Sequence, residues 1–279
     1  MKRGAFGLLL ALLALVACGG RDSAPVGLVP AAAPARSGVV FRPTGSTGFP
    51  EPPVVSAVNG VAKVDLEAAE NTTDGMPTFD YKGANDVAPT IEVKPGDTIV
   101  LNLANDLPSE PPPAMQGGMQ MHGIAQPDTG MQEDMNLHFH GLGTSPNRPA
   151  DDVLTMLAKP GQKLHYVVHI PANQEPGLYW YHPHVHAETN FQVGESGMSG
   201  AIVVDGIERH LPGLRKMKQR LIIVRATGLG GDVRPNHTNT APCVTKDGLT
   251  TSLNNIVTPV ITIAPGERQF FRLVNATGH

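Results

Sequence analysis

The sequence predicts an all-β fold, a β-sandwich of short strands followed by the start of a second β-domain. Apolar residues alternate with polar ones in short stretches, and long helical periodicities are scarce. Glycine and proline are abundant, at 31 and 26 of the 279 residues. Pro-Gly pairs also recur directly ahead of apolar stretches, which is typical of strands joined by turns.

The first strands follow one another closely. Residues 61–67 alternate like a half-buried strand, and residues 78–83 form a second candidate. Residues 90–93 lead through the Pro-Gly turn at 94–97 into an apolar stretch at 98–103. Strand, turn and strand in this order predict a hairpin.

Later strands indicate a second, related domain. The strands expected at 164–168 and 269–274 each follow another Pro-Gly turn, and this recurrence suggests a repeated β-domain. We expect the first domain over residues 53–208 and the start of the second over 215–279. The second stretch is short for a sandwich of about 100 residues. The sequence therefore predicts a fragment, with a short chain that pairs with another subunit as the alternative.

The N-terminus has the pattern of an export signal. Residues 1–18 begin with two basic residues, continue with an apolar run at 6–16 and end at Cys18. This resembles the bacterial lipobox and predicts a lipid-anchored protein of the cell envelope that faces the periplasm. The alternative is an ordinary secretory signal with a chance cysteine. Residues 19–52, rich in Ala, Pro, Gly and Ser, then form a flexible tether.

Composition limits the remaining options. Charged residues make up 16% of the chain, the net charge is −4, and no basic stripe is present, so nucleic acid is not an expected partner. Cys243 is the only other cysteine. With Cys18 lipidated it has no disulfide partner, and we interpret it as a loop cysteine rather than a copper thiolate.

Two histidine-rich motifs carry the strongest functional signal. His138 and His140 lie two residues apart, as do His182, His184 and His186, and together they are five of the eleven histidines. Alternate residues of a strand share a face, so each motif is expected to present its imidazoles together. Neutral imidazole binds copper, zinc and iron. The spacing therefore predicts a metal site.

The flanks of these motifs carry a family resemblance. The matching segments are, in order, 80–97, 102–108, the His-x-His-Gly run at 138–141, 179–184, 197–204 and 253–275. They resemble the N-terminal part of the multicopper oxidases, laccase-like enzymes built from cupredoxin domains. The resemblance covers residue 54 to the end and implies a cupredoxin-like Greek-key β-sandwich.

The resemblance implies which copper each histidine holds. In this family the two motifs supply half of a trinuclear cluster at which dioxygen is reduced to water. By the matching positions His138 would bind the type 2 copper, and His140, His182 and His184 the type 3 pair. Zinc, or buried histidines without a metal, is the alternative that the spacing alone leaves open.

Residues near the motifs have two interpretations each. His186 is a further ligand or a neighbour of the ligands. Asp151 is a proton relay, as the resemblance implies, or half of a turn pair with Asp152. Five of the ten methionines lie between residues 115 and 135. Thioether sulfur favours Cu(I), so the candidate accessory copper ligands are Met115, Met119 and Met121. A low-complexity loop with methionine as filler is the alternative.

One half of the expected centre has no counterpart in the sequence. The family's type 1 copper lies in a His-Cys-His motif, which this chain lacks, so the chain carries four of eight cluster ligands. The others are expected from a missing C-terminal part or another subunit. We predict an oxidase that couples one-electron oxidation of a reductant to dioxygen reduction, inactive as this chain alone. The alternatives are a copper-buffering lipoprotein and, less favoured without a type 1 cysteine in the first domain, a copper nitrite reductase.

Overall fold

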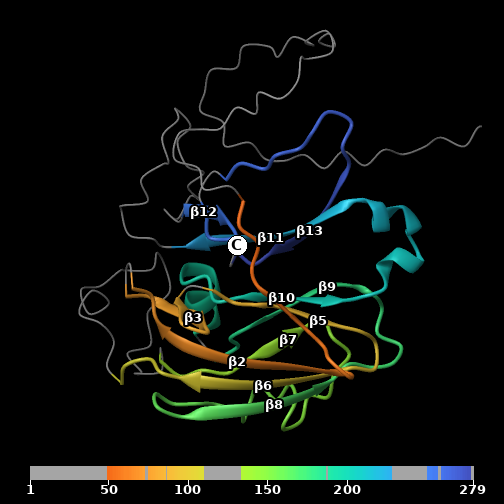
Figure 1. Cartoon of the computed structure of the whole chain (residues 1–279). Helices are drawn as coiled ribbons and strands as arrows, with labels where there is room; N and C mark the ends of the chain where they lie inside the picture. Colours follow the sequence, from red (N-terminus) through yellow and green to blue (C-terminus); the bar gives the residue numbers. More distant parts are fainter. Residues whose placement is uncertain are drawn as a thin grey trace, which may run out of the picture. The chain divides into compact units, whose positions relative to one another are not determined.

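The computed structural model describes residues 49–72, 75–85, 87–109, 133–186, 188–227, 250–256 and 259–277 (Figure 1). The expected signal peptide, most of the tether, Cys243 and the candidate ligands Met115, Met119 and Met121 lie outside these ranges. The described part is built from strands, which confirms the all-β fold. No helix in these ranges is long and apolar enough to cross a membrane.

Two five-stranded sheets form the main body. Across the first sheet the order is β1 (Val54–Ser56), β5 (Thr90–Val93), β10 (Gly200–Val204), β9 (Gly177–His182) and β7 (His138–His140). Across the second it is β4 (Ala84–Asn85), β3 (Pro77–Tyr81), β2 (Val61–Glu70), β6 (Thr98–Asn105) and β8 (Lys163–His169). Both sheets mix parallel and antiparallel pairs, because the chain repeatedly crosses from one sheet to the other.

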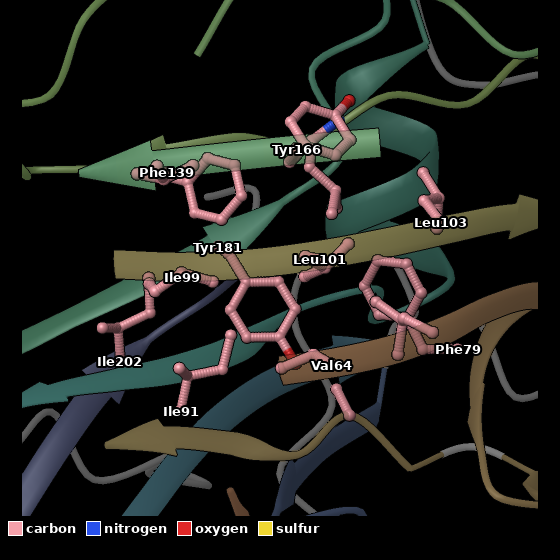
Figure 2. Packing of buried hydrophobic residues seen from close by; sticks show 14 of the residues in the cluster. Val64, Phe79, Ile91, Ile99, Leu101, Leu103, Phe139, Tyr166, Tyr181 and Ile202 are labelled. Carbon is pink, nitrogen blue, oxygen red and sulfur yellow. The ribbon is translucent and has the colours of Figure 1, made fainter. Parts of the chain in front are cut away.

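A single core lies between the two sheets. In β2 the apolar residues alternate with exposed polar ones, so that Val64 and Leu66 are buried while Asp65 is exposed. Figure 2 shows how side chains of both sheets meet: the ring of Phe79 from β3 lies 6.2 Å from that of Tyr181 in β9. Burying one large apolar side chain contributes about 1.5–3 kcal/mol, so this shared core holds the sheets together.

The hairpin expected at residues 90–103 is not present. β5 pairs with β1 and β10 in the first sheet, whereas β6 pairs with β2 and β8 in the second. The turn between them, with Gly96 at φ 93°, carries the chain from one layer to the other. A Pro-Gly turn between strands fits both arrangements. Here Ile91 and Ile99 both bury their side chains in the core from opposite sheets, which a flat hairpin does not allow.

The C-terminal strands form a third, smaller sheet. Its order is β12 (Thr250–Leu253), β11 (Lys218–Thr227) and β13 (Gln269–Asn275), with β11 and β13 parallel. A second apolar cluster joins this sheet to the first one through Ala201, Leu221, Ile223, Val274 and Ala276, with Leu178 and Trp180 packed against it. The short helical turns are η1 (Asn190–Glu195), η2 (Ile207–Arg209) and η3 (Pro212–Lys216). The expected domain division near residues 208–215 stays a prediction.

Candidate metal centre

Strand β7 presents the first histidine pair as the sequence predicts. His138 and His140 flank Phe139, whose side chain is fully buried and packs with its ring 5.6 Å from that of Tyr166. Because Phe139 points into the core, both histidines point to the opposite face of the strand. Their ring centroids lie 5.3 Å apart.

The second motif reaches the same place by a different route. His182 is the last residue of β9 and pairs with His138 across the sheet. His184 lies beyond the end of the strand, so the expectation that one strand face carries both is wrong for His184. The strand ends at His182 because the next residue, Pro183, has no backbone N–H to donate to the ladder. The rings of His182 and His184 nevertheless lie 6.0 Å apart.

Four imidazoles converge at this edge of the first sheet. The ring of His138 lies 5.5 Å from that of His182 and 5.3 Å from that of His184, and the ring of His140 lies 5.6 Å from that of His182. One nitrogen each of His138, His140 and His182 falls within 4.8 Å of the other two. Three or four imidazole nitrogens at this spacing suit copper or zinc.

A hydrogen bond at Nδ1 of His182 leaves its other ring nitrogen available to bind a metal. Its Nδ1 lies 2.7 Å from the carbonyl oxygen of Pro183, which can only accept, so Nδ1 carries the proton. Nε2 therefore holds a lone pair, and it is buried without a hydrogen-bond partner. Burial lowers the pKa of His182 to about 4, helped by the neighbouring histidines. A neutral imidazole with a buried, unpaired nitrogen fits a metal ligand.

Asp151 fixes His138 in a similar way. Its two carboxylate oxygens lie 3.0 and 2.9 Å from Nδ1 of His138, and Oδ1 also accepts the backbone N–H of Phe139 at 2.9 Å. An ionised carboxylate only accepts, so Nδ1 of His138 donates and Nε2 is free for a metal. The structure thus places Asp151 directly behind a candidate ligand. Its neighbour Asp152 instead accepts backbone N–H bonds from Leu154 and Thr155 in its own turn.

Trp180 was not among the residues predicted for the site. Its ring stacks on that of His182 at 4.2 Å and on that of His140 at 5.1 Å. Partial burial lowers the pKa of His140, and the neighbouring His138 and His184 lower it further. The spacing held a signal for this role, because Trp180 lies two residues before His182 in β9 and faces the same way.

His186 stands apart from the other four histidines. It lies in an exposed turn after β9, and among the described residues it takes part in none of the ring contacts that join the others. Its role as a ligand stays a prediction.

Comparison with known proteins points to the multicopper oxidases. A family model described as multicopper oxidase matches residues 129–209, which contain both histidine motifs and Asp151. Residues 129–209 thus resemble a multicopper oxidase domain. Multicopper oxidases named mco from Staphylococcus epidermidis and Staphylococcus aureus are 26% and 25% identical to the chain over 224 residues. Each match covers 78% of this chain and 43% of the relative, so the chain spans less than half the length of these proteins.

Solved structures of multicopper oxidases share the fold of this domain and its C-terminal extension. McoA from the hyperthermophile Aquifex aeolicus superposes with a TM-score of 0.55 at 18% identity, over 83% of this chain and 46% of McoA. A laccase from Pediococcus acidilactici superposes with a TM-score of 0.50 at 18% identity, over 78% of this chain and 43% of the laccase. These neighbours have cupredoxin folds, which confirms the expected sandwich type.

Proposed function

We propose that this chain provides one wall of a trinuclear copper cluster in an oxidase that reduces dioxygen to water. The observation that carries the proposal is the convergence of four imidazoles from β7 and the end of β9, within a domain of the multicopper oxidase type. In this assignment His138 holds the type 2 copper, and His140, His182 and His184 hold the type 3 pair. Bound copper would supply one-electron redox chemistry, drawing on a reductant whose identity the chain does not reveal.

The protein's own groups have distinct tasks in this proposal. The Pro183 carbonyl and the Asp151 carboxylate accept from Nδ1 of His182 and His138, which leaves Nε2 of each ring available to bind metal. Asp151 is also the proposed proton relay, since making water consumes protons. Support for this comes from its position, because its side chain is 12% exposed while it touches His138. A carboxylate that meets both solvent and a ligand ring can pass protons between them.

The remaining ligands of the cluster are proposed to come from outside this chain, either from a C-terminal part of the complete protein or from another subunit. Within the described residues, one sheet edge carries four imidazoles and the face of His140 and His184 is exposed. Such an open arrangement fits one wall of a shared site. We expect the chain alone to bind copper without turning over dioxygen.

Copper titration tests the ligand assignment. Trp180 is the only tryptophan of the chain and stacks on two of the proposed ligands, so bound Cu²⁺ should quench its fluorescence. We expect saturable quenching in the chain and its loss in His182→Ala. The matched control His165→Ala changes an exposed histidine of β8 that bonds Asn102, and quenching should persist there. Absence of saturable quenching in the unaltered chain would refute the assignment.

Oxygen consumption tests the reaction. The protein expressed from its complete reading frame and loaded with copper should consume dioxygen when given a phenolic or metal-ion reductant, and should show the blue absorption of a type 1 site. Tight copper binding with neither property would instead favour the copper-buffering lipoprotein, in which Met115, Met119 and Met121 collect Cu(I).

The cellular location is part of the same proposal. We propose export and lipid attachment at Cys18, so that the oxidase faces the periplasm from a membrane. Metabolic labelling with a radioactive fatty acid should mark the chain, and Cys18→Ser should abolish the label. A labelled Cys18→Ser chain, or an unlabelled wild-type chain, would overturn the anchor.

A further inference from the structure

Asn136 holds the backbone of His184 in place. The Oδ1 atom of Asn136 accepts the N–H of His184 at 2.7 Å, and its Nδ2 lies 3.3 Å from the carbonyl oxygen of the same residue. Nδ2 also donates to the carbonyl of Val153 at 3.1 Å. One buried side-chain amide therefore serves both backbone groups of a proposed copper ligand.

The strand register explains why a side chain is needed at this point. β7 and β9 pair antiparallel, with His138 opposite His182. Continued to two residues before His138 and two residues after His182, this register places Asn136 opposite His184. Backbone pairing stops before that point, because β9 ends at His182 and Pro183 has no N–H to donate. The amide of Asn136 takes over the hydrogen bonds that a continued ladder would provide.

Asn136 itself is held on both sides, so it can act as a fixed support. Met135 exchanges two backbone hydrogen bonds of 2.8 Å with Ala158. On the other side, the N–H of Leu137 donates to the hydroxyl of Tyr166 at 2.9 Å. Both neighbours of Asn136 are fully buried. His184, in contrast, has an exposed side chain after the end of its strand.

From this arrangement we infer that Asn136 is a positioning residue that selectively sets the imidazole of His184 in the metal centre. His138, His140 and His182 lie on strands and keep their places through the sheet ladder. The place of His184 depends on the amide of Asn136. The inference rests on the proposed copper site and adds a specific residue to it.

A double-mutant comparison tests the inference with Cu²⁺ alone as the probe. Asn136→Ala should lower the Cu²⁺ affinity of the full chain about 10- to 100-fold, the range found when groups supporting a ligand are removed. The electron paramagnetic resonance spectrum should show one coordinating nitrogen fewer. In a His184→Ala background, Asn136→Ala should cause no further loss of affinity. An equal loss in both backgrounds, or no loss in the first, would overturn the inference.

A matched variant separates positioning from general stability. Asn254 is also a buried asparagine whose side chain bonds only backbone groups, donating to the carbonyls of Pro50 and Leu221 and accepting the N–H of Ile223. Asn254→Ala should reduce thermal stability and leave Cu²⁺ affinity unchanged. If Asn136→Ala does not fold, Asn136→Asp replaces it in both backgrounds. That variant keeps an acceptor for the His184 N–H and loses both donated bonds. An equal loss of Cu²⁺ affinity in both backgrounds, or no loss in the first, would again overturn the inference.

The imidazole signals of the copper-free chain distinguish this inference from the proposed function. In nuclear magnetic resonance spectra Asn136→Ala should shift or broaden the His184 ring signal, assigned with His184→Ala, and leave the signals of His138 and His182 in place. A chain that binds no Cu²⁺ but shows this change would refute the copper site and keep the positioning role. If Cu²⁺ binds but the His184 signal is unchanged by Asn136→Ala, the copper site stands and the positioning role is refuted.

Discussion

Asp151 holds both the imidazole ring of His138 and the backbone of the strand that carries it. Its carboxylate accepts from Nδ1 of the imidazole at 2.9 Å and from the backbone N–H of the next residue, Phe139, also at 2.9 Å. The side chain and the backbone of β7 are thereby fixed to the same group, although 13 residues separate Asp151 from His138.

Replacing Asp151 should weaken copper binding. Asp151→Asn keeps the size of the side chain but removes the charge that holds the proton on Nδ1 of His138, so we expect a loss of about 10- to 100-fold in Cu²⁺ affinity. Fluorescence titration through Trp180 measures it. Asp152→Asn is the matched control, because Asp152 bonds Leu154 and Thr155 in its own turn. Equal affinities for the two variants would contradict this role of Asp151.

The copper-free chain should lose stability in acid because of His182. The pKa of this ring falls from 6.5 to about 4 on burial. As the pH drops, the unfolded chain binds the proton first, so the contribution to stability is lost between these two values. It amounts to about 3 kcal/mol between pH 7.5 and pH 4.

Urea unfolding at several pH values isolates this effect. His182→Gln has no titrating ring, so its free energy of unfolding should fall less over the same interval, by about 3 kcal/mol. Titrating groups that do not interact with His182 contribute equally to both proteins and cancel in the comparison. Parallel pH profiles for the wild type and His182→Gln would show that burial does not shift this histidine.

Gly200 should tolerate no side chain. It lies opposite Tyr181 in the ladder between β10 and β9, and a Cβ atom there would come 2.2 Å from the Tyr181 ring. Tyr181 cannot yield easily, because it is fully buried and donates its hydroxyl to the carbonyl of Pro89 at 2.7 Å. Gly200→Ala should therefore destabilise the chain by about 3 kcal/mol, the upper end for overpacking.

The control for this substitution lies in η3. A Cβ added at Gly213 would meet nothing within 4 Å, so Gly213→Ala should change the free energy of unfolding by less than about 0.5 kcal/mol. Chemical denaturation of both variants makes the comparison. A stable Gly200→Ala chain would mean that Tyr181 can move.

The buried hydroxyl of Tyr166 should contribute more to folding stability than the exposed hydroxyl of Tyr179. It accepts the N–H of Leu137, directly before His138, at 2.9 Å in the buried core. Tyr166→Phe leaves this N–H without a partner and should cost about 1–3 kcal/mol. Tyr179→Phe removes a hydroxyl bonded to the carbonyl of Glu175 in an exposed setting and should cost less than about 0.5 kcal/mol. Thermal melts that rank the two variants in the opposite order would contradict the prediction.

Much of the fold could be predicted because strand periodicity is local. The expected strand at 90–93 coincides with β5, and the expected strand at 164–168 lies within β8 at Lys163–His169. Which strands pair is not local. The turn after β5 has the composition of a hairpin turn, but its two strands bury side chains from opposite sheets, and only the packing of the core decides between these arrangements.

The positions of some histidines could likewise be predicted from local periodicity, whereas others depend on tertiary contacts. Alternation along a strand was sufficient to predict that His138 and His140 share a face, and the motif flanks pointed to multicopper oxidases. Alternation failed for His184, which reaches the centre only because Asn136 replaces the interrupted ladder. The stacking of Trp180 on His140 likewise depends on the cross-strand register that pairs the two residues.

By itself, therefore, the sequence determined the strand character, the residue types of the centre and the resemblance to multicopper oxidases. The tertiary structure decided which groups hold the imidazoles: Asp151 behind His138, the Pro183 carbonyl at His182, and Asn136 beneath His184. The reason is physical. Side-chain alternation repeats every two residues along one strand, whereas these hydrogen bonds depend on how strands and loops are brought together by packing.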